Sequence, residues 1–255
     1  MSKKKNRKRK RLKRLIIAYL LRAIVILIPI LMIILMVCGC LYIYERFTNE
    51  DDAIDIYADD DTVPVTLGAD NVSELCVVID AGHGGSGGGT VNGKTIEKDI
   101  NLSVALKLKD ILEDNSIEVV LTRSSDEDMS LEQRTSVANA ANADFFISLH
   151  CNYYEDDAQI AGLECYYSSP DATESKAYAE SIINAASSSD DIITREAKAE
   201  HYYVVRNTTM PAVLVEMGFL SNYSECQKLV REDYQEILAQ KIAEGILQEL
   251  SDDMI

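Results

Sequence analysis

The chain of 255 residues contains six cysteines but no Cys-x-x-Cys pair. The absence of such a pair argues against a structural zinc knuckle. Two of the six lie in an apolar run near the N-terminus, and two of the others, Cys76 and Cys165, fall within strand patterns. We therefore expect buried free thiols at the four cysteines outside that run, which are Cys76, Cys151, Cys165 and Cys226.

Basic residues are scarce after the first 22 positions. Eleven of the 25 Lys and Arg residues lie in residues 1–22, which contain no acid, so the rest of the chain carries 14 basic residues against all 42 acidic ones. A body this acidic repels phosphate backbones, and we do not expect it to bind nucleic acid. The sequence also has no internal repeat and no second module long enough to form another domain.

Residues 23–44 contain no charged side chain and read AIVILIPILMIILMVCGCLYIY. At about 1.5 Å per helical residue this run covers a bilayer core of roughly 30 Å, which predicts a transmembrane helix. The basic run lies before it and acids follow it, so the positive-inside rule places residues 1–22 in the cytoplasm as a basic tail. We expect a single-pass protein of the cell membrane, with everything after about residue 45 outside.

Other interpretations of the N-terminus remain open. VCGC at 37–40 partly resembles a lipoprotein processing box with Cys40 as the lipidated residue, although the apolar LYIY that follows is unusual for one. A cleaved signal peptide is disfavoured by the length of the apolar run and the lack of a small-x-small site. Nuclear targeting or nucleic-acid binding is the alternative for the basic run.

Residues 45–73 are acidic with little periodicity and are typical of a linker. Residues 74–252 then alternate short β-branched runs with helical patterns, which predicts a single α/β domain with a mostly parallel sheet flanked by helices. The expected strands are 75–80, 118–122, 144–150, 163–167, 202–205 and 212–217. Helical spacing links Ile100 to Leu112 and Val230 to Ile246.

Polar side chains gather where these strands end. The first expected strand runs into His83, the third ends at His150, and these are two of only three histidines in the chain. Ligands of open α/β sheets bind at the carboxyl ends of the strands. A catalytic zinc site needs about three protein ligands and one open position. Glu97 is a suitable third ligand, because it opens a helix after a Gly-rich loop.

Each of these residues also has an ordinary explanation. Taken alone, Glu97 is a favourable charge in a first helical turn, and either histidine is a hydrogen-bonded structural residue. The stretch Gly82–Gly87 matches G-x-G-x-x-G, the dinucleotide-binding pattern, but about ten residues separate its last glycine from the next helix. Cys151 adjoins His150, yet neighbouring strand residues face opposite sides, so we interpret Cys151 as structural.

Several motifs together carry a resemblance to a known family. They read VVIDAGHGG, GKTIEKDINL, LEQRTSVANAANADFFISLHCN, GLECYY and AVLVEMGFLSN. From about Leu75 to Leu250 the sequence resembles the zinc-dependent N-acetylmuramoyl-L-alanine amidases of the amidase-3 family. The resemblance implies that His83, Glu97 and His150 bind one Zn²⁺ per domain and that Glu216 is catalytic.

The resemblance further implies a six-stranded mixed sheet and cleavage of the amide between N-acetylmuramic acid and L-alanine in peptidoglycan. In this scheme zinc lowers the pKa of a bound water toward about 7, and Glu216 acts as general base and then as general acid. The first motif departs from the family pattern, because Ala81 replaces a proline and Ser86–Gly89 occupies a region that commonly holds an acid. Loop rigidity around His83 is therefore expected to differ.

Four further residues are candidates for supporting the site or contacting substrate: Asn101, Arg134, Asn152 and Arg206. Peptidoglycan stem peptides carry carboxylates, which suit the donors of an arginine. Only 55 residues separate His150 from Arg206, too few for a long inserted blocking helix, so we expect an open cleft in a monomeric catalytic domain. Two rival functions remain: an inactive relative that binds peptidoglycan or a protein partner, and a zinc carboxypeptidase acting on the stem peptide.

Overall fold

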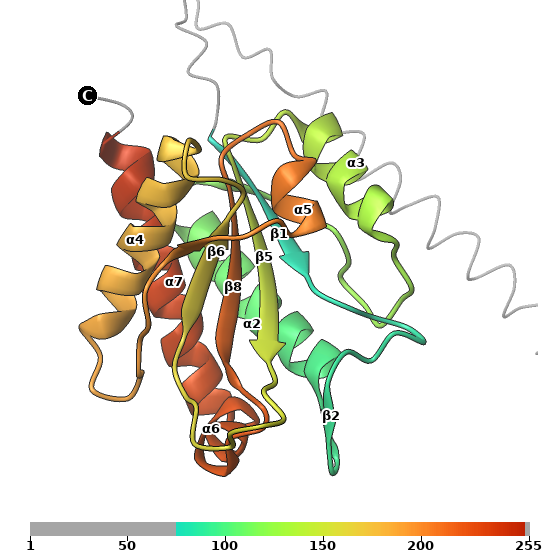
Figure 1. The fold of residues 1–255 in the computed structure, drawn as a ribbon. Coiled ribbons are helices and arrows are strands. Elements are labelled where there is room, and N and C mark those ends of the chain that lie inside the picture. The colour runs from blue at the N-terminus through green and yellow to red at the C-terminus, as the bar shows by residue number, and fades with distance from the viewer. Residues whose placement is uncertain (1–74, 253–255) are drawn as a thin grey trace, which may run out of the picture. The chain divides into compact units, whose positions relative to one another are not determined.

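The computed structural model describes residues 75–252, which form an α/β domain around a mixed six-stranded sheet (Figure 1). The predicted tail 1–22, transmembrane helix 23–44 and linker 45–73 lie outside the described residues. Within residues 75–252 no helix has both the length and the apolar character needed to cross a bilayer. The strands are β1 (Cys76–Ala81), β2 (Val91–Asn92), β3 (Thr95–Ile96), β4 (Glu118–Leu121), β5 (Phe145–Asn152), β6 (Glu164–Tyr167), β7 (Lys198–Ala199) and β8 (Ala212–Phe219). The helices are α2 (Glu97–Asp114), α3 (Leu131–Ala141), α4 (Thr173–Ser187), α5 (Tyr203–Arg206), α6 (Tyr223–Leu229) and α7 (Glu232–Asp252).

The main sheet has the strand order β4-β1-β5-β8-β6-β7. The four strands from β4 to β8 are parallel, whereas β6 runs antiparallel to β8 and parallel to β7. The central strands β1 and β8 are buried at every residue, as expected for strands covered on both faces. The predicted single α/β domain with a mixed six-stranded sheet is therefore confirmed.

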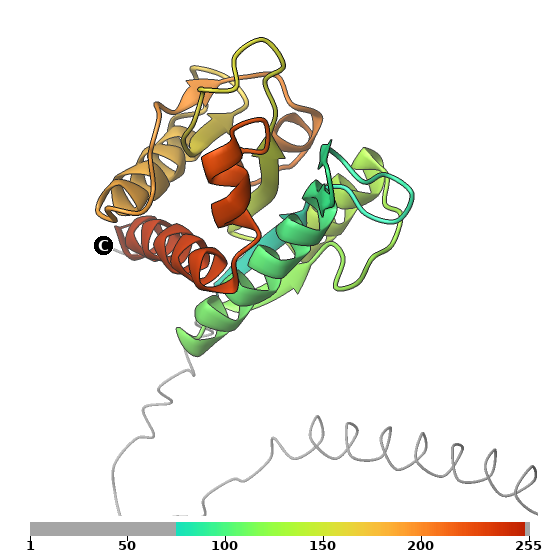
Figure 2. The ribbon, with the colours of Figure 1, turned by 90° about the horizontal axis from the view of Figure 1, so that it is seen from below.

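The two faces of the sheet are covered unequally. The long helices α2, α4 and α7 pack on one face, over the side chains of Val77, Ile79 and Leu149 (Figure 2). Among the helices of residues 75–252, only α3 and the single turn α5 lie on the other face, where they cover Phe146 and Leu214. Alternate residues of a strand share a face. The side chains that follow Phe146 and Leu214 on this second face, nearer the ends of the strands, are therefore covered by little helical structure.

One expected strand is wrong. Residues 202–205 are not extended: Tyr203–Arg206 form α5, and the sixth strand of the sheet is β7 at Lys198–Ala199. Val204 and Val205 are both buried in the same cluster, whereas consecutive strand residues would point to opposite faces. A four-residue β-branched run cannot be distinguished from a buried helical turn by its periodicity.

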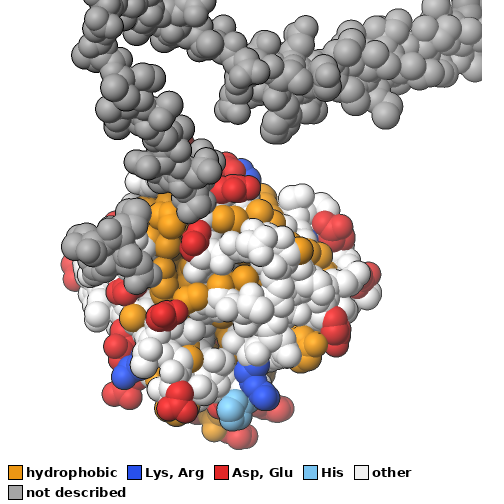
Figure 3. Space-filling model, turned by 90° about the horizontal axis from the view of Figure 1, so that it is seen from above, with side chains coloured by type: hydrophobic (Ala, Val, Ile, Leu, Met, Phe, Trp, Pro, Cys, Tyr) orange, Lys and Arg blue, Asp and Glu red, His pale blue; other side chains and the backbone are white. Residues whose placement is uncertain are grey.

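Surface charge follows the composition. On the face shown in Figure 3, acidic side chains are scattered widely and basic ones are few. The four cysteines that the structure describes are buried and free, which confirms the expected thiols at Cys76, Cys151, Cys165 and Cys226. Cys151 packs in the core beneath the sheet, on the face opposite to that of its neighbour His150.

Candidate functional site

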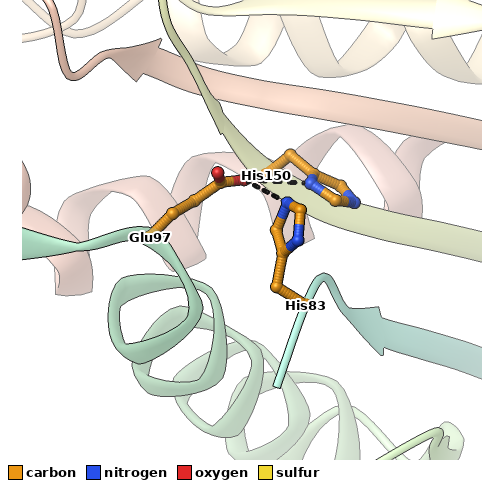
Figure 4. Close-up of side chains that lie close together, drawn as sticks. All are labelled: His83, Glu97 and His150. Carbon is orange, nitrogen blue, oxygen red and sulfur yellow. Dashed lines mark hydrogen bonds and ion pairs between the residues drawn. The ribbon is translucent and has the colours of Figure 1, made fainter. Parts of the chain in front are cut away.

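Three side chains from three different elements meet at the carboxyl ends of the parallel strands (Figure 4). His83 lies in the loop after β1, Glu97 is the first residue of α2, and His150 lies near the end of β5. The Oε1 atom of Glu97 is 3.1 Å from Nε2 of His83 and 3.0 Å from Nδ1 of His150. The structure therefore brings together the three residues that the sequence singled out.

This donor set fits a zinc ion. One ligand atom from each residue lies within 4.8 Å of the others, and zinc bonds of about 2.0–2.2 Å in a tetrahedral arrangement require ligand atoms to lie close together in this way. Two imidazoles and one carboxylate form a common catalytic zinc set. The side chain of His83 is about one-third exposed, at 34%, so the cluster is open toward solvent on one side.

Glu97 is held as an anion at this position. Burial raises the pKa of its carboxyl, but hydrogen bonds from His150 and His83 lower the pKa by a larger amount. The resulting pKa lies well below the usual value. Backbone N–H groups also donate to it, Thr90 to Oε2 at 2.7 Å and Cys151 to Oε1 at 3.1 Å. A buried carboxylate fixed from several sides is preorganised to bind a cation.

The backbone at His83 has φ of +61°, a left-handed conformation unusual for a residue other than glycine. The loop is fixed by reciprocal backbone hydrogen bonds between Gly84 and Gly87 and by donation from Ser86 to Asp128 at 2.7 Å. The serine that departs from the family pattern thus contacts an acid from another loop. After Gly87 the chain forms the β2–β3 hairpin before α2 starts, an arrangement unlike a dinucleotide-binding loop.

Arg134 is buried beneath this loop, on α3. It donates to Oδ1 of Asp80 at 2.7 Å and to the backbone carbonyls of Ala81, His83 and Met129. Its partner Asp80 also accepts hydrogen bonds from hydroxyl groups of the neighbouring strands. Arg134 therefore holds the strained His83 backbone in place.

Glu216 lies opposite His150 in the β5–β8 ladder, and its side chain is on the same face of the sheet. It is buried, and its Oε2 is the one buried side-chain oxygen or nitrogen without a hydrogen-bond partner among residues 75–252. Burial, and then the nearby charges of Glu97 and Glu164, raise its pKa to about 8. Such a carboxyl exchanges a proton near neutral pH.

The histidines and Glu216 line one cavity of about 460 Å³. Its other walls come from the Gly-rich loop, the segment before and at the start of α3, and α5. The lining residues beside these three are Asp80, Gly84, Ser86, Gly87, Asp128, Met129, Leu131, Arg134, Tyr202, Tyr203, Val204 and Leu214. No segment within residues 75–252 fills the cavity, and the expected open cleft stays a prediction.

The other three candidate residues lie in different places. Asn101 is fully buried on α2, and its Nδ2 donates to the carbonyl of Gly82 and to Oε1 of Glu97. Asn152 donates to Oε2 of Glu164 at 3.1 Å. Arg206 lies at the end of α5, where it lines a separate cavity with residues of the loop before α4, and a role for it in substrate binding stays a prediction.

Sequence reasoning missed Asp80, Glu164 and Arg123, three charged residues that the fold buries close to the site. Arg123 donates to the carbonyls of Ala81, Gly82 and Lys98, and so ties the loop before His83 to the first turn of α2. Asp80 was visible in the sequence as an acid at a strand end. Nothing in the sequence indicates that Arg123 turns inward.

Comparisons with known proteins agree with this geometry. A family model described as N-acetylmuramoyl-L-alanine amidase, Amidase_3, matches residues 77–248. The germination-specific N-acetylmuramoyl-L-alanine amidase of Bacillus subtilis is 34% identical over 191 residues, which cover 69% of this chain and 80% of that protein. The uncharacterized protein YqiI of the same organism is 37% identical over 184 residues, covering 72% and 88% of the two chains.

Solved structures show the same similarity. The catalytic domain of the amidase CwlV from Bacillus (Paenibacillus) polymyxa matches with a TM-score of 0.65 and 40% identity, and the match covers 69% of this chain and 98% of that one. The CwlD amidase of Clostridioides difficile, solved in complex with the GerS lipoprotein, matches with a TM-score of 0.65 and 32% identity, covering 70% of this chain and all of that one.

Proposed function

The chain belongs to the Amidase_3 family of N-acetylmuramoyl-L-alanine amidases, and from that premise we propose a zinc-dependent mechanism in which Glu216 transfers the protons. The enzyme class and the peptidoglycan substrate follow from the family and from the similarity to named amidases. The observation that carries the mechanism is the meeting of His83 and His150 with Glu97, beside a buried glutamate without a hydrogen-bond partner in the cavity that the two histidines line.

His83, Glu97 and His150 would hold the zinc ion. When bound, zinc makes a coordinated water more acidic and polarises a carbonyl group. Glu97 supplies the negative charge of the set, and Asn101 together with the N–H groups of Thr90 and Cys151 fixes its orientation. Arg134 donates to the backbone carbonyl of His83 and so helps to hold the loop that carries this ligand.

Glu216 is the proposed general base and acid. Its Oε2 has no hydrogen-bond partner within the described residues, and its pKa is raised to about 8 by burial and by the two nearby glutamates. A group with this pKa accepts a proton from water and returns it to the departing amine of L-alanine without a large free-energy difference between the two states. The products would be a free stem peptide and a glycan strand with an intact lactyl carboxylate.

We also propose that the domain acts outside the cell membrane. The support is the sequence alone: eleven basic residues at positions 1–22, the uncharged run 23–44 and the acidic segment after it. Lipid attachment at Cys40 is the alternative anchor. Protease treatment of intact cells separates an external domain from a cytoplasmic one, because only the external domain is degraded before lysis.

The proposed reaction is tested with the full-length protein in detergent and purified peptidoglycan. The wild type, treated with chelator or resupplied with zinc, is compared with Glu216→Gln, which preserves the side-chain shape but cannot take up the proton. Zinc-dependent release of stem peptides with a free L-alanine N-terminus, seen by mass spectrometry and lost in the variant, supports the proposal. Trimmed peptides still joined to glycan would identify a carboxypeptidase, and no product at all would leave a binding protein.

A further inference from the structure

A second charged cluster lies beyond Glu216 on the same face of the sheet. Glu164 of β6 is paired directly with Glu216 of β8 in the antiparallel ladder, and Glu216 is paired with His150 of β5. Directly paired residues of adjacent strands point to the same side. One row of side chains therefore runs from the proposed zinc site to Glu164.

Glu164 is an acid with four hydrogen-bond donors around it. Oε1 accepts from Nε of Arg195 at 2.7 Å and from Nζ of Lys198 at 3.1 Å. Oε2 accepts from the hydroxyl of Tyr166 at 2.8 Å and from Nδ2 of Asn152 at 3.1 Å. Its side chain is only 4% exposed, whereas those of Arg195 and Lys198 are 39% and 45% exposed.

This arrangement places two cations on one anion, and the guanidinium of Arg195 also lies 6.0 Å from the ring of Phe219 and near the buried Glu225. One cation would neutralise Glu164, yet two contact it, so the group of three carries a formal charge of +1. The Nε of Arg195 donates to Glu164, whereas its two terminal nitrogens have no hydrogen bond to any residue in 75–252. Their donors form a fork that matches a carboxylate. Glu164 thus holds the two cationic side chains in place, while donors that do not contact Glu164 stay available to a ligand.

One side chain of the catalytic cavity contacts this cluster. Tyr202 lines that cavity and meets Tyr166 edge to face, with ring centroids 5.2 Å apart. The hydroxyl of Tyr166 in turn contacts Glu164. The cationic pair therefore lies beyond Tyr166 and Tyr202 on the side of Glu216 away from His150.

The spacing suits a peptide attached at the scissile amide. Neighbouring strands lie about 4.8 Å apart, so β6 and β7 are about 5 and 10 Å from β8. Two residues of extended peptide span about 7 Å. A carboxylate on the second residue of the stem peptide would fall between these strands, where Arg195 and Lys198 present their free donors.

We propose that Arg195 and Lys198, held by Glu164, form the subsite for a carboxylate on the second residue of the stem peptide; the inference rests on the proposed amidase reaction. The peptide then runs from Glu216 across β6 toward β7, and the glycan occupies the opposite side of the cavity, toward α3. Glu164 is a positioning residue for the two cations. The enzyme would distinguish a substrate with a free carboxylate from one in which that group is amidated.

The test uses two synthetic N-acetylmuramoyl tripeptides, both amidated at the C-terminus, which differ only in a carboxylate or a carboxamide on the second residue. The full-length zinc-loaded protein is compared with Arg195→Gln and Lys198→Met. The matched controls are Arg231→Gln and Lys176→Met, whose cations are exposed and pair with acids away from the cavity. In parallel, calorimetry measures the binding of the two free tripeptides to Glu216→Gln, both alone and combined with each of the four other substitutions.

The expected wild-type KM is about tenfold lower for the carboxylate substrate than for the carboxamide, equivalent to about 1.4 kcal/mol. Arg195→Gln and Lys198→Met should lose most of this preference between the two substrates, and the control variants should keep it. Equal preference in all variants, or none in the wild type, overturns the subsite. If neither the wild type nor any variant hydrolyses either compound, the proposed reaction fails. The subsite is then tested by calorimetry alone, as a preference for the carboxylate tripeptide that Arg195→Gln and Lys198→Met remove.

Discussion

Gly89 lies where a side chain would enter the proposed zinc site. Its φ is +69°, and a Cβ atom added there would be 2.5 Å from Oε2 of Glu97 and 2.6 Å from Cδ2 of His83. Neither distance is tolerated by real atoms, so in Gly89→Ala the two side chains must move apart. The change therefore disturbs two ligands without removing either one.

The β2–β3 turn offers a matched control. Gly93 has nearly the same conformation, with φ of +62°, but a Cβ built there meets nothing within 4 Å. Both alanine variants incur the left-handed penalty of about 1–2 kcal/mol, and Gly89→Ala should show the larger fall in Tm when metal-free because it alone has the clash. The difference between them isolates the clash with Glu97 and His83.

We expect Gly89→Ala to bind zinc about 10–100-fold more weakly than Gly93→Ala, the range found when the support of a metal ligand is lost. In free energy this is about 1.4–2.7 kcal/mol. The assay is competition with a chromogenic chelator, at a pH where both variants are folded by circular dichroism. Equal zinc affinity in the two variants would show that Glu97 and His83 do not act together as ligands, and would refute the proposed site.

Three further outcomes are expected. Because burial raises the pKa of Glu216 to about 8, the metal-free protein loses stability as pH rises from about 4.5 through 8, and Glu216→Gln, which cannot ionise, should gain Tm relative to wild type over that range; a constant difference would contradict the raised pKa. Gly245→Ala should lower stability by about 1–3 kcal/mol in urea unfolding, because its Cβ would lie 2.5 Å from Cα of Ile182 where α7 meets α4, although alanine favours an isolated helix; a stabilised variant would show that the helices separate freely. Arg134→Met should cost about 3–5 kcal/mol by leaving Asp80 buried and unpaired, and Asp80→Asn combined with it should recover part of this loss in the same unfolding assay.

The positions of the main site residues could be predicted because they depend on local order along the chain. Parallel strands bring their carboxyl ends to one edge, so polar residues directly after β1 and near the ends of β5 and β8 had to meet there. The apolar spacing from Ile100 to Leu112 likewise fixed the helix that carries Glu97 at its start. The zinc ligand set itself came from the family resemblance.

What could not be predicted depends on contacts between distant segments. Arg195 and Lys198 precede or lie in a two-residue edge strand with no hydrophobic alternation, so nothing local marks them as neighbours of Glu164. Arg134 was a candidate for supporting the site or contacting substrate, but its partners Asp80 and the backbone of His83 follow only from the packing of α3 under the loop. The turn at Val204 and Val205 was interpreted as a strand because burial, not periodicity, distinguishes the two.

Three glutamates at this end of the sheet show how environment assigns chemical roles to one residue type. Burial raises the pKa of each, but hydrogen bonds from the two histidines reverse the shift at Glu97, and donors led by Tyr166 and Arg195 reverse it at Glu164. Glu216 has no donor on Oε2 and has the other two charges nearby, so its pKa alone rises. Burial without a donor on Oε2, and to a smaller extent the two neighbouring anions, thus make the central carboxyl the one whose pKa lies near neutral. Neutralising Glu164 as glutamine should therefore lower the pKa of Glu216 and shift the basic limb of the metal-free stability profile with it, an effect that a purely structural role for Glu164 would not produce.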